Sequence, residues 1–496
     1  MPALPKIGFL SLGCPKNLVD SEVMMGILAR HGYELTPRAD DAEVLVVNTC
    51  SFIEAAQQES VNTILEMAEY KKFGRAQRLV VAGCLVERFR DQIREQIPEV
   101  DAVIGTGDIE QIIQAVSGDQ RPSAAAVSEG GLPMFLYHEA MPRVLSTPRH
   151  AAYIKIAEGC DHPCSFCIIP QLRGKFRSRR FESVVREAEN LAAAGVREIT
   201  LIGQDTTSYG EDLGLRDGLP TLLERLAGME SLAWVRFLYA YPNRVTQRLL
   251  DTLAEHPRLV KYMDMPLQHA SRNVLARMKR GSSGDAFLRL IERIRATIPG
   301  VMLRTSFIAG FPGETDADFR ELADFVRAAE FDWMGVFAYS DVDSAGSYLL
   351  DDKVPAEVIA ERRDKLMAIQ RGISARRLRR FKGQRLAALV EGPSKENELV
   401  WEARLEGMAP DIDGKVYLTD LEPPDGSGLY LQPGAKGSRP ALPGDMVTVE
   451  IAETHDYDLV GSVVEVHEQA APSARAGAAP NPMARIATGA PLRVLA

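Results

Sequence analysis

Three of the six cysteines of this 496-residue chain lie within eight positions, in the segment EGCDHPCSFCIIP (158–170). The spacing Cys160-x3-Cys164-x2-Cys167 puts three thiolates on one tight loop, where each can bind a different iron of a single cubane cluster. Because such a cluster has four irons, one iron stays open to a small molecule. The alternative is a closed zinc site with His162 as fourth ligand, but His162 lies between two of the cysteines, where its ring would not easily join them.

Each of the other three cysteines directly follows an apolar, strand-like run. Cys14 ends KIGFLSLGC, Cys50 ends EVLVVNTC and Cys84 ends RLVVAGC, and a helical stretch follows each run. This alternation predicts βα units on a parallel sheet. The carboxyl ends of parallel strands lie along one edge, so we expect the three cysteines to gather there. The alternative is that Cys50 and Cys84 are simply small buried hydrophobic residues.

The elements that position these cysteines predict an α/β protein with five segments. Residues 1–118 form an N-terminal parallel-sheet α/β domain, and residues 119–148, rich in Gly, Pro, Ala and Ser, a linker. Residues 149–382 contain six strand-like runs separated by helices, typical of a complete or partial (β/α) barrel with its active site at the strand C-termini. Short β-rich runs over 383–468 predict a small β-barrel, and the Ala- and Pro-rich residues 469–496 predict a disordered tail.

Two further features near strand ends could accommodate a small molecule. Phe166, directly before Cys167, can pack either against a flat ligand or into the core. The run SFIAGFPGE ends a strand in small residues, which let the backbone approach a ligand but also occur in ordinary turns. The residues concerned in that run are Gly310, Pro312 and Gly313.

Together these motifs resemble the radical S-adenosylmethionine (SAM) enzymes, and the N-terminal cysteines resemble those of the methylthiotransferases among them. The resemblance extends to about residue 468. Among the methylthiotransferases, the chain is most similar to the RimO-type branch, which acts on an aspartate of ribosomal protein S-12. The tRNA-modifying branch, MiaB, carries Gln-Met in place of Pro15 and Lys16, and Ser-Gly in place of His269 and Ala270. The motifs that carry the resemblance are LGCPKNLVDSE (12–22), EGCDHPCSFCIIPQLRGKFRSR (158–179), GQDTTSYG (203–210), MPLQHAS (265–271) and APDIDGKVYL (409–418).

The resemblance implies a central radical SAM domain, a C-terminal TRAM-like β-barrel, and SAM with two 4Fe-4S clusters as cofactors. The Cys160, Cys164 and Cys167 cluster would bind SAM and generate the radical that removes hydrogen from the aspartate β-carbon. A second cluster, on Cys14, Cys50 and Cys84, would carry the sulfur, with the methyl group coming from another SAM. The residues that contact SAM in this family correspond here to Gly203 and Gln204 and to the segment Gly310, Pro312 and Gly313. The segment YSDVDSAGSY (339–348) departs from the family pattern, which leaves its part in the pocket open.

The implied partners are ribosomal protein S-12, free or in the small ribosomal subunit, an electron donor and ribosomal RNA. Two alternatives stay open. One is a tRNA adenosine methylthiotransferase with the same chemistry. The other, from a different class, is a non-catalytic, metal-stabilised RNA-binding protein.

Composition limits these alternatives. A net charge of −10 argues against a protein that coats nucleic acid, so any basic contact must be local. The stretches RGKFRSRR (173–180) and RRLRRFKG (376–383) are such candidates, and we expect the second to be a solvated face. Asp20 and Glu22 are expected to be ordinary acids near a helix N-terminus. No apolar run is long enough for a membrane span and the N-terminus lacks a signal-peptide pattern, so we expect a cytoplasmic protein with no membrane partner.

Overall fold

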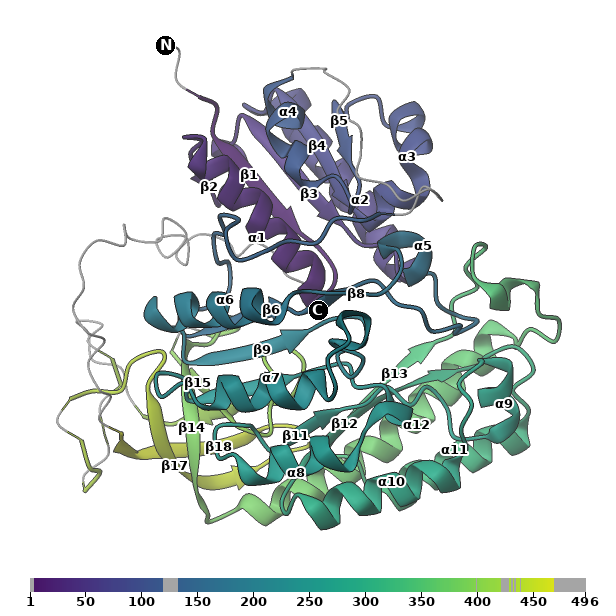
Figure 1. Cartoon of the computed structure of the whole chain (residues 1–496), viewed down its shortest axis with the longest axis vertical. Coiled ribbons are helices and arrows are strands. Elements are labelled where there is room, and N and C mark those ends of the chain that lie inside the picture. The colour runs from purple at the N-terminus through teal and green to yellow at the C-terminus, as the bar shows by residue number, and fades with distance from the viewer. Residues whose placement is uncertain are drawn as a thin grey trace.

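The structure is a computed structural model. It describes residues 4–118, 133–397, 399–420, 428–429, 431, 434–437 and 439–467. The predicted tail over 469–496 and the first part of the predicted linker, 119–132, lie outside these ranges. Figure 1 shows the N-terminal domain, in purple and blue, above a central domain in teal and green, with the yellow C-terminal barrel beside the central domain.

The N-terminal domain is a parallel five-stranded sheet of order β2-β1-β3-β4-β5, as the βα pattern predicts. Its strands are β1 (Ile7–Ser11), β2 (Leu35–Thr36), β3 (Val44–Thr49), β4 (Arg78–Gly83) and β5 (Ala102–Ile104). Strand β3 is buried along its whole length, because helices cover both faces of a parallel sheet. The two-residue β2 is an addition to the predicted strands, too short to leave a periodic signal.

Alternate residues of β3 pack on opposite faces of this sheet. Val44 and Val46 face helices α1 (Pro15–Arg30) and α4 (Ile112–Ser117), whereas Leu45 and Val47 face α2 (Glu54–Phe73) and α3 (Cys84–Gln96). Helix α1 also packs against the first strand of the central domain, β6 (Ala151–Lys155). The N-terminal domain is therefore anchored to the central domain through α1.

The central domain contains all six predicted strands, arranged as two three-stranded parallel sheets. The orders are β10-β9-β6 and β11-β12-β13, and a parallel bridge between Val235 and Leu259 joins them. This is a partial (β/α) barrel. The remaining strands are β9 (Glu198–Ile202), β10 (Trp234–Phe237), β11 (Tyr262–Asp264), β12 (Met302–Ala309) and β13 (Trp333–Ala338). The helices are α5 (Ile169–Arg173), α6 (Phe181–Ala193), α7 (Gly218–Ala227), α8 (Gln247–Glu255), α9 (Arg272–Arg277), α10 (Gly284–Thr297), α11 (Asp316–Ala329) and α12 (Ala356–Leu378).

The C-terminal strands close into a five-stranded barrel of order β14-β15-β16-β18-β17, which confirms the predicted small β-barrel. They are β14 (Arg385–Pro393), β15 (Trp401–Leu405), β16 (Val416–Leu418), β17 (Met446–Thr454) and β18 (Leu459–Val466). Trp401 of the barrel belongs to the same hydrophobic cluster as Tyr262 and Trp333 of the central domain. The barrel is therefore packed onto the central domain rather than tethered to it.

Within the described ranges, no helix combines the length and the apolar character that a membrane span requires.

Candidate site between two cysteine triads

One cavity of about 1560 Å³ lies between the N-terminal and central domains, and all six cysteines line it. We call Cys14, Cys50 and Cys84 the N-terminal triad, and Cys160, Cys164 and Cys167 the central triad. A cavity for a single small ligand usually measures roughly 300–1,000 Å³. This one has room for a small molecule together with a segment of another macromolecule.

The N-terminal triad lies at the carboxyl edge of the sheet, as the strand pattern indicates. Cys14 is the N-cap of α1, Cys50 follows β3 and Cys84 begins α3. Burial, with Cys84 and Cys14 as like-charged neighbours, raises the pKa of the Cys50 thiol to about 12. Gly13 has a φ of 85°, and a Cβ added there would lie 2.7 Å from the Cβ of Cys50. Only glycine therefore fits beside Cys50 without displacing it.

The central triad lies on the loop between β7 (Ala157–Glu158) and α5. Burial raises the pKa of Cys160 to about 11 and that of Cys167 to about 12. Arg280 donates a hydrogen bond from Nη1 to the Cys164 sulfur at 3.7 Å. A thiolate or a bound anionic cluster would gain from this positive charge.

The ring of His162 is engaged away from the cysteines. It forms a hydrogen bond with Asp205, 2.6 Å from Nε2 to Oδ2, and stacks on Tyr241 with ring centroids 3.8 Å apart. Among the residues that the structure describes, no three His, Cys, Asp or Glu side chains come together as ligands of one metal ion. A cubane spreads its thiolates over separate irons, whereas a closed zinc site needs four ligands on one ion. The ring of His162, bound to Asp205 and Tyr241, is not directed at the cysteines as a fourth ligand.

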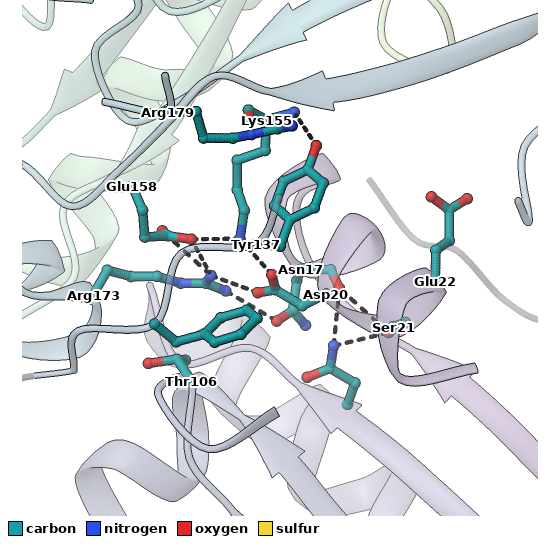
Figure 2. A network of polar contacts seen from close by, with 12 residues as sticks. Asn17, Asp20, Ser21, Glu22, Thr106, Tyr137, Lys155, Glu158, Arg173 and Arg179 are labelled. Carbon is teal, nitrogen blue, oxygen red and sulfur yellow. Dashed lines mark hydrogen bonds and ion pairs between the residues drawn. The ribbon is translucent and has the colours of Figure 1, made fainter. Parts of the chain in front are cut away.

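Arg173 lies at the centre of a buried polar network between the two domains (Figure 2). Its Nη1 donates to Asp20 Oδ2 at 2.6 Å and to Glu158 Oε2 at 3.3 Å. Its Nη2 donates to Asn17 Oδ1 at 3.1 Å and to the sulfur of Cys84 at 3.5 Å. The guanidinium therefore connects the loop of the central triad to the N-terminal triad.

Lys155 and Gln204 complete this network around Glu158. Lys155 forms ion pairs with Asp20 and with Glu158, the latter at 2.5 Å. Burial alone would raise the pKa of Glu158, but Lys155 and Arg173 outweigh it and lower this pKa to about 2. Gln204 donates a hydrogen bond from Nε2 to Glu158 Oε1 at 2.7 Å. The buried Oε1 of Gln204 itself has no partner in the described structure. An orphaned acceptor beside the cavity suits a ligand that brings a donor.

A second part of the network involves the segment that we predicted to be a linker. Arg143 pairs with Glu22 at 2.6 Å and with Glu187 at 2.7 Å, and Tyr137 donates to Glu187 at 2.9 Å. The described residues 133–148 therefore hold the two domains together. Glu22 is fully buried and, like Asp20, lies beyond the first turn of α1, so both are interdomain ion-pair partners rather than first-turn acids.

Tyr239 and Tyr241, which follow β10, line the cavity between the triads. Tyr239 has a φ of 64°, and its backbone N–H donates to Asp264 Oδ2 at 2.9 Å. The Lys16 ammonium lies 3.3 Å from the centroid of the Tyr239 ring, and burial lowers the pKa of Lys16. These residues were missed from the sequence, although aromatic residues at the carboxyl end of a barrel strand are a signal that could have found them.

The predicted small-molecule contacts divide into two groups. Phe166 and Gln204 line the cavity, and Phe166 also packs half-buried against the cluster around Phe311. The others fall outside the cavity lining in the described structure. This second group comprises Gly203, Gly310, Pro312 and Gly313.

The glycines after β12 have a local structural role. A Cβ added at Gly310 would collide with Ile359, and one at Gly313 would lie 2.5 Å from Arg277, whose Nε donates to the carbonyl of Pro312 at 2.9 Å. These residues allow the chain to turn from β12 into α11. Contact between this turn and SAM stays a prediction.

Neither basic stretch is a simple charged surface. Arg173 and Arg179, in the first, are 2% and 1% exposed and form internal ion pairs. In the second, Arg377 and Arg380 both pair with the buried Asp332, so the expectation of a purely solvated face was wrong. The physical reason is that α12 packs against β13. Arg377 in α12 and Arg380 in the turn that follows it therefore reach the carboxylate directly before that strand.

Comparisons with known proteins match the three parts of the chain. Residues 6–105 match the uncharacterized protein family UPF0004, residues 154–326 the radical SAM superfamily and residues 383–464 the TRAM domain. Among solved structures, the radical SAM methyltransferase TsrM from Kitasatospora setae, with cobalamin and a [4Fe-4S] cluster bound, has a TM-score of 0.49 at 18% identity, covering 68% of this chain and 75% of that chain.

Curated relatives cover almost the whole chain. The ribosomal protein uS12 methylthiotransferase RimO of Koribacter versatilis is 56% identical over 92% of this chain and 96% of its own length. The protein of the same name from Solibacter usitatus is 60% identical over 94% of this chain and 96% of its own. The chain thus belongs to the RimO family of ribosomal protein uS12 methylthiotransferases.

Proposed function

We propose that this protein is the enzyme that adds a methylthio group to the β-carbon of an aspartate in ribosomal protein uS12. The observation that carries the proposal is the presence of both cysteine triads on one cavity. Two radical-type half-reactions, hydrogen removal and sulfur insertion, must act on the same carbon. A shared cavity allows the substrate to meet both sites without leaving the protein.

The residues of each triad fit a 4Fe-4S cluster, and each triad would leave one iron without a protein ligand. Cys160, Cys164 and Cys167 would hold the cluster that binds SAM, and Cys14, Cys50 and Cys84 the cluster that carries sulfur. Bound there, these cofactors would supply the radical, the sulfur and the methyl group.

The protein's own side chains would position the reactants. Phe166 offers an aromatic face next to Cys167, and the free Oε1 of Gln204 offers an acceptor in the lining of the same cavity. Arg280 and Arg173 place positive charge at the sulfurs of Cys164 and Cys84. Hydrogen bonds to ligand sulfurs are one way in which a protein tunes the reduction potential of a cluster.

The finer predictions about context belong to this proposal. We propose the cytoplasm as the location, an electron donor as a partner, ribosomal RNA as a contact, and the TRAM barrel as a part that binds the protein substrate. The substrate is uS12, either free or in the small ribosomal subunit. We keep the domain boundaries 1–118, 149–382 and 383–468 as predictions.

Mass spectrometry of purified substrates tests the proposal. Anaerobically reconstituted enzyme, SAM, a reductant and a sulfide source are incubated with uS12 or, separately, with tRNA. We expect the mass of one methylthio group on an aspartate of uS12 and no change in tRNA. The mass of a methylthio group on tRNA, with uS12 unchanged, would support the adenosine-modifying alternative instead.

Metal analysis separates the enzyme from a metal-stabilised RNA-binding protein. Two four-iron clusters predict about eight irons per chain. Stoichiometric zinc in a colourless, anaerobically purified protein would contradict the proposal.

A further inference from the structure

Lys16 presents an unpaired ammonium group to the cavity that contains both triads. The residue is 7% exposed, lies two positions after Cys14 and belongs to the first turn of α1. In the described structure its Nζ has no hydrogen bond and no ion pair, and it lies 3.3 Å from the centroid of the Tyr239 ring. The ammonium interacts at longer range with Cys14, Asp264 and Glu158 but contacts no anion directly. A largely buried charge without a direct partner is costly, which indicates a site that can accept an anionic ligand.

The other basic side chains of the cavity lining are already engaged. Each has a hydrogen bond or an ion pair, and they are Arg38, His162, Arg173, Arg280 and Arg304. The charge of Lys16 is therefore the one in the described lining that remains available to a ligand.

Lys16 also lies where a substrate would meet both triads. The Tyr239 ring beneath its ammonium belongs to the segment after β10, and two residues further on Tyr241 stacks on His162 of the central cysteine loop. Tyr239 has a positive φ, which costs energy in a residue other than glycine and persists only where the surroundings enforce it. Here the hydrogen bond from its backbone N–H to Asp264 enforces it. The structure thus maintains the ring below Lys16 in spite of local strain.

We propose that Lys16 binds the side-chain carboxylate of the aspartate that is modified, an assignment that rests on the proposed function. In aspartate the carboxylate is bonded directly to the β-carbon, so an ion pair at Nζ restricts where the reacting C–H bond can lie. The pair forms in a largely buried site, where charges interact more strongly than in water. Neither asparagine nor an adenine base brings a negative charge to Lys16, so this residue selects an acidic acceptor.

A double-mutant cycle between enzyme and substrate tests the assignment. Wild-type enzyme and the Lys16→Met variant are assayed anaerobically with natural uS12 and with uS12 in which the target aspartate is changed to asparagine. With natural uS12, Lys16→Met should lower kcat/KM for methylthio formation by about 10- to 100-fold, the usual effect of losing one hydrogen bond to a charged group. With the asparagine substrate the same mutation should have little further effect, because the contact is already absent.

Two additional variants control for other effects. Lys16→Arg keeps the charge and should retain more activity than Lys16→Met. Lys365→Met removes an exposed lysine of α12 that lies outside the cavity lining, and it should match wild type. Iron content and the SAM cleavage that occurs without substrate should be unchanged in Lys16→Met, since the assignment concerns substrate alone.

The outcomes separate this inference from the proposed function. If wild-type enzyme leaves uS12 unmodified, the proposed function fails. If wild type modifies uS12 and Lys16→Met does so within about two-fold, the Lys16 assignment is overturned. Loss of iron or of SAM cleavage in Lys16→Met, or equal effects on both substrates, would also overturn it, because Lys16 would then serve the cofactors or the fold.

Discussion

Arg173 in the central domain donates a hydrogen bond to the sulfur of Cys84 in the N-terminal domain, with 3.5 Å between Nη2 and Sγ. The same guanidinium binds Asp20, which α1 of the N-terminal domain contributes, and Glu158, which precedes the central triad. One side chain therefore links the placement of both triads to the packing of the two domains.

The first prediction concerns this linking role. Arg173→Gln should lower the free energy of unfolding by about 3–5 kcal/mol, because it leaves Asp20 and Glu158 with one cation, Lys155, where they had two. Denaturant unfolding of the anaerobic protein measures the loss. Arg180→Gln, at an exposed position of the same stretch, should change stability by no more than about 0.5 kcal/mol. Equal effects of the two substitutions would show that the buried network contributes little.

The second prediction separates the two triads chemically. In Cys84→Ala, SAM cleavage should survive while the methylthio product is lost, because only the N-terminal triad is damaged. In Cys164→Ala both should be lost. Chromatography of 5′-deoxyadenosine and mass spectrometry of uS12 provide the two measurements. Loss of SAM cleavage in Cys84→Ala would instead indicate that the N-terminal cysteines support folding.

The third prediction uses the close approach of Gly13 to Cys50. Gly13→Ala should lower the iron bound to the N-terminal triad, because the new Cβ would occupy space 2.9 Å from the Cys50 sulfur. Gly300→Ala is the matched control, since Gly300 has a similar φ of 79° and nothing within 4 Å of an added Cβ. About four irons in Gly13→Ala and about eight in Gly300→Ala are expected. If both variants retain the full iron content, the contact with Cys50 does not matter.

The fourth prediction concerns pH and the junction of the barrel with the central domain. Burial alone would raise the pKa of Glu391. Arg404 and a 2.9 Å contact with His150 outweigh burial, so the pKa is lowered from 4.5 to about 2. A lowered carboxyl pKa contributes stability above pH 4.5 that is lost as the pH falls toward 2. Glu391→Gln should therefore be less stable than wild type by about 2–3 kcal/mol at pH 7, with a smaller difference at pH 3.5.

Thermal or denaturant unfolding at pH 7, 5 and 3.5 measures this difference. Glu396→Gln, at an exposed site of the same barrel, is the control and should follow wild type at each pH. A Glu391→Gln effect that did not depend on pH would mean that the carboxylate charge is not the stabilising feature.

Local patterns were sufficient to predict most of the architecture. Each predicted run became a strand because burial on a parallel sheet or in a barrel imposes a pattern within a few residues, whereas the two-residue strands β2 and β8 (Arg177–Ser178) were not predicted. The cysteines were equally readable. Their spacing on one loop, and their position after three strands of one sheet, follow from the chain itself, and the fold brings both sets to one cavity.

The pairing of charges could be decided only by the tertiary structure. Asp20 and Arg173 are 153 positions apart, and in the sequence each resembles an ordinary charge at the surface of a helix. Whether a charge is solvated, paired or left free depends on which elements pack around it, because burial makes an unpaired charge costly and a partner necessary. The same holds for Lys16, whose residue type was visible in the sequence but whose free ammonium, in a cavity between two domains, appears only once the chain is folded.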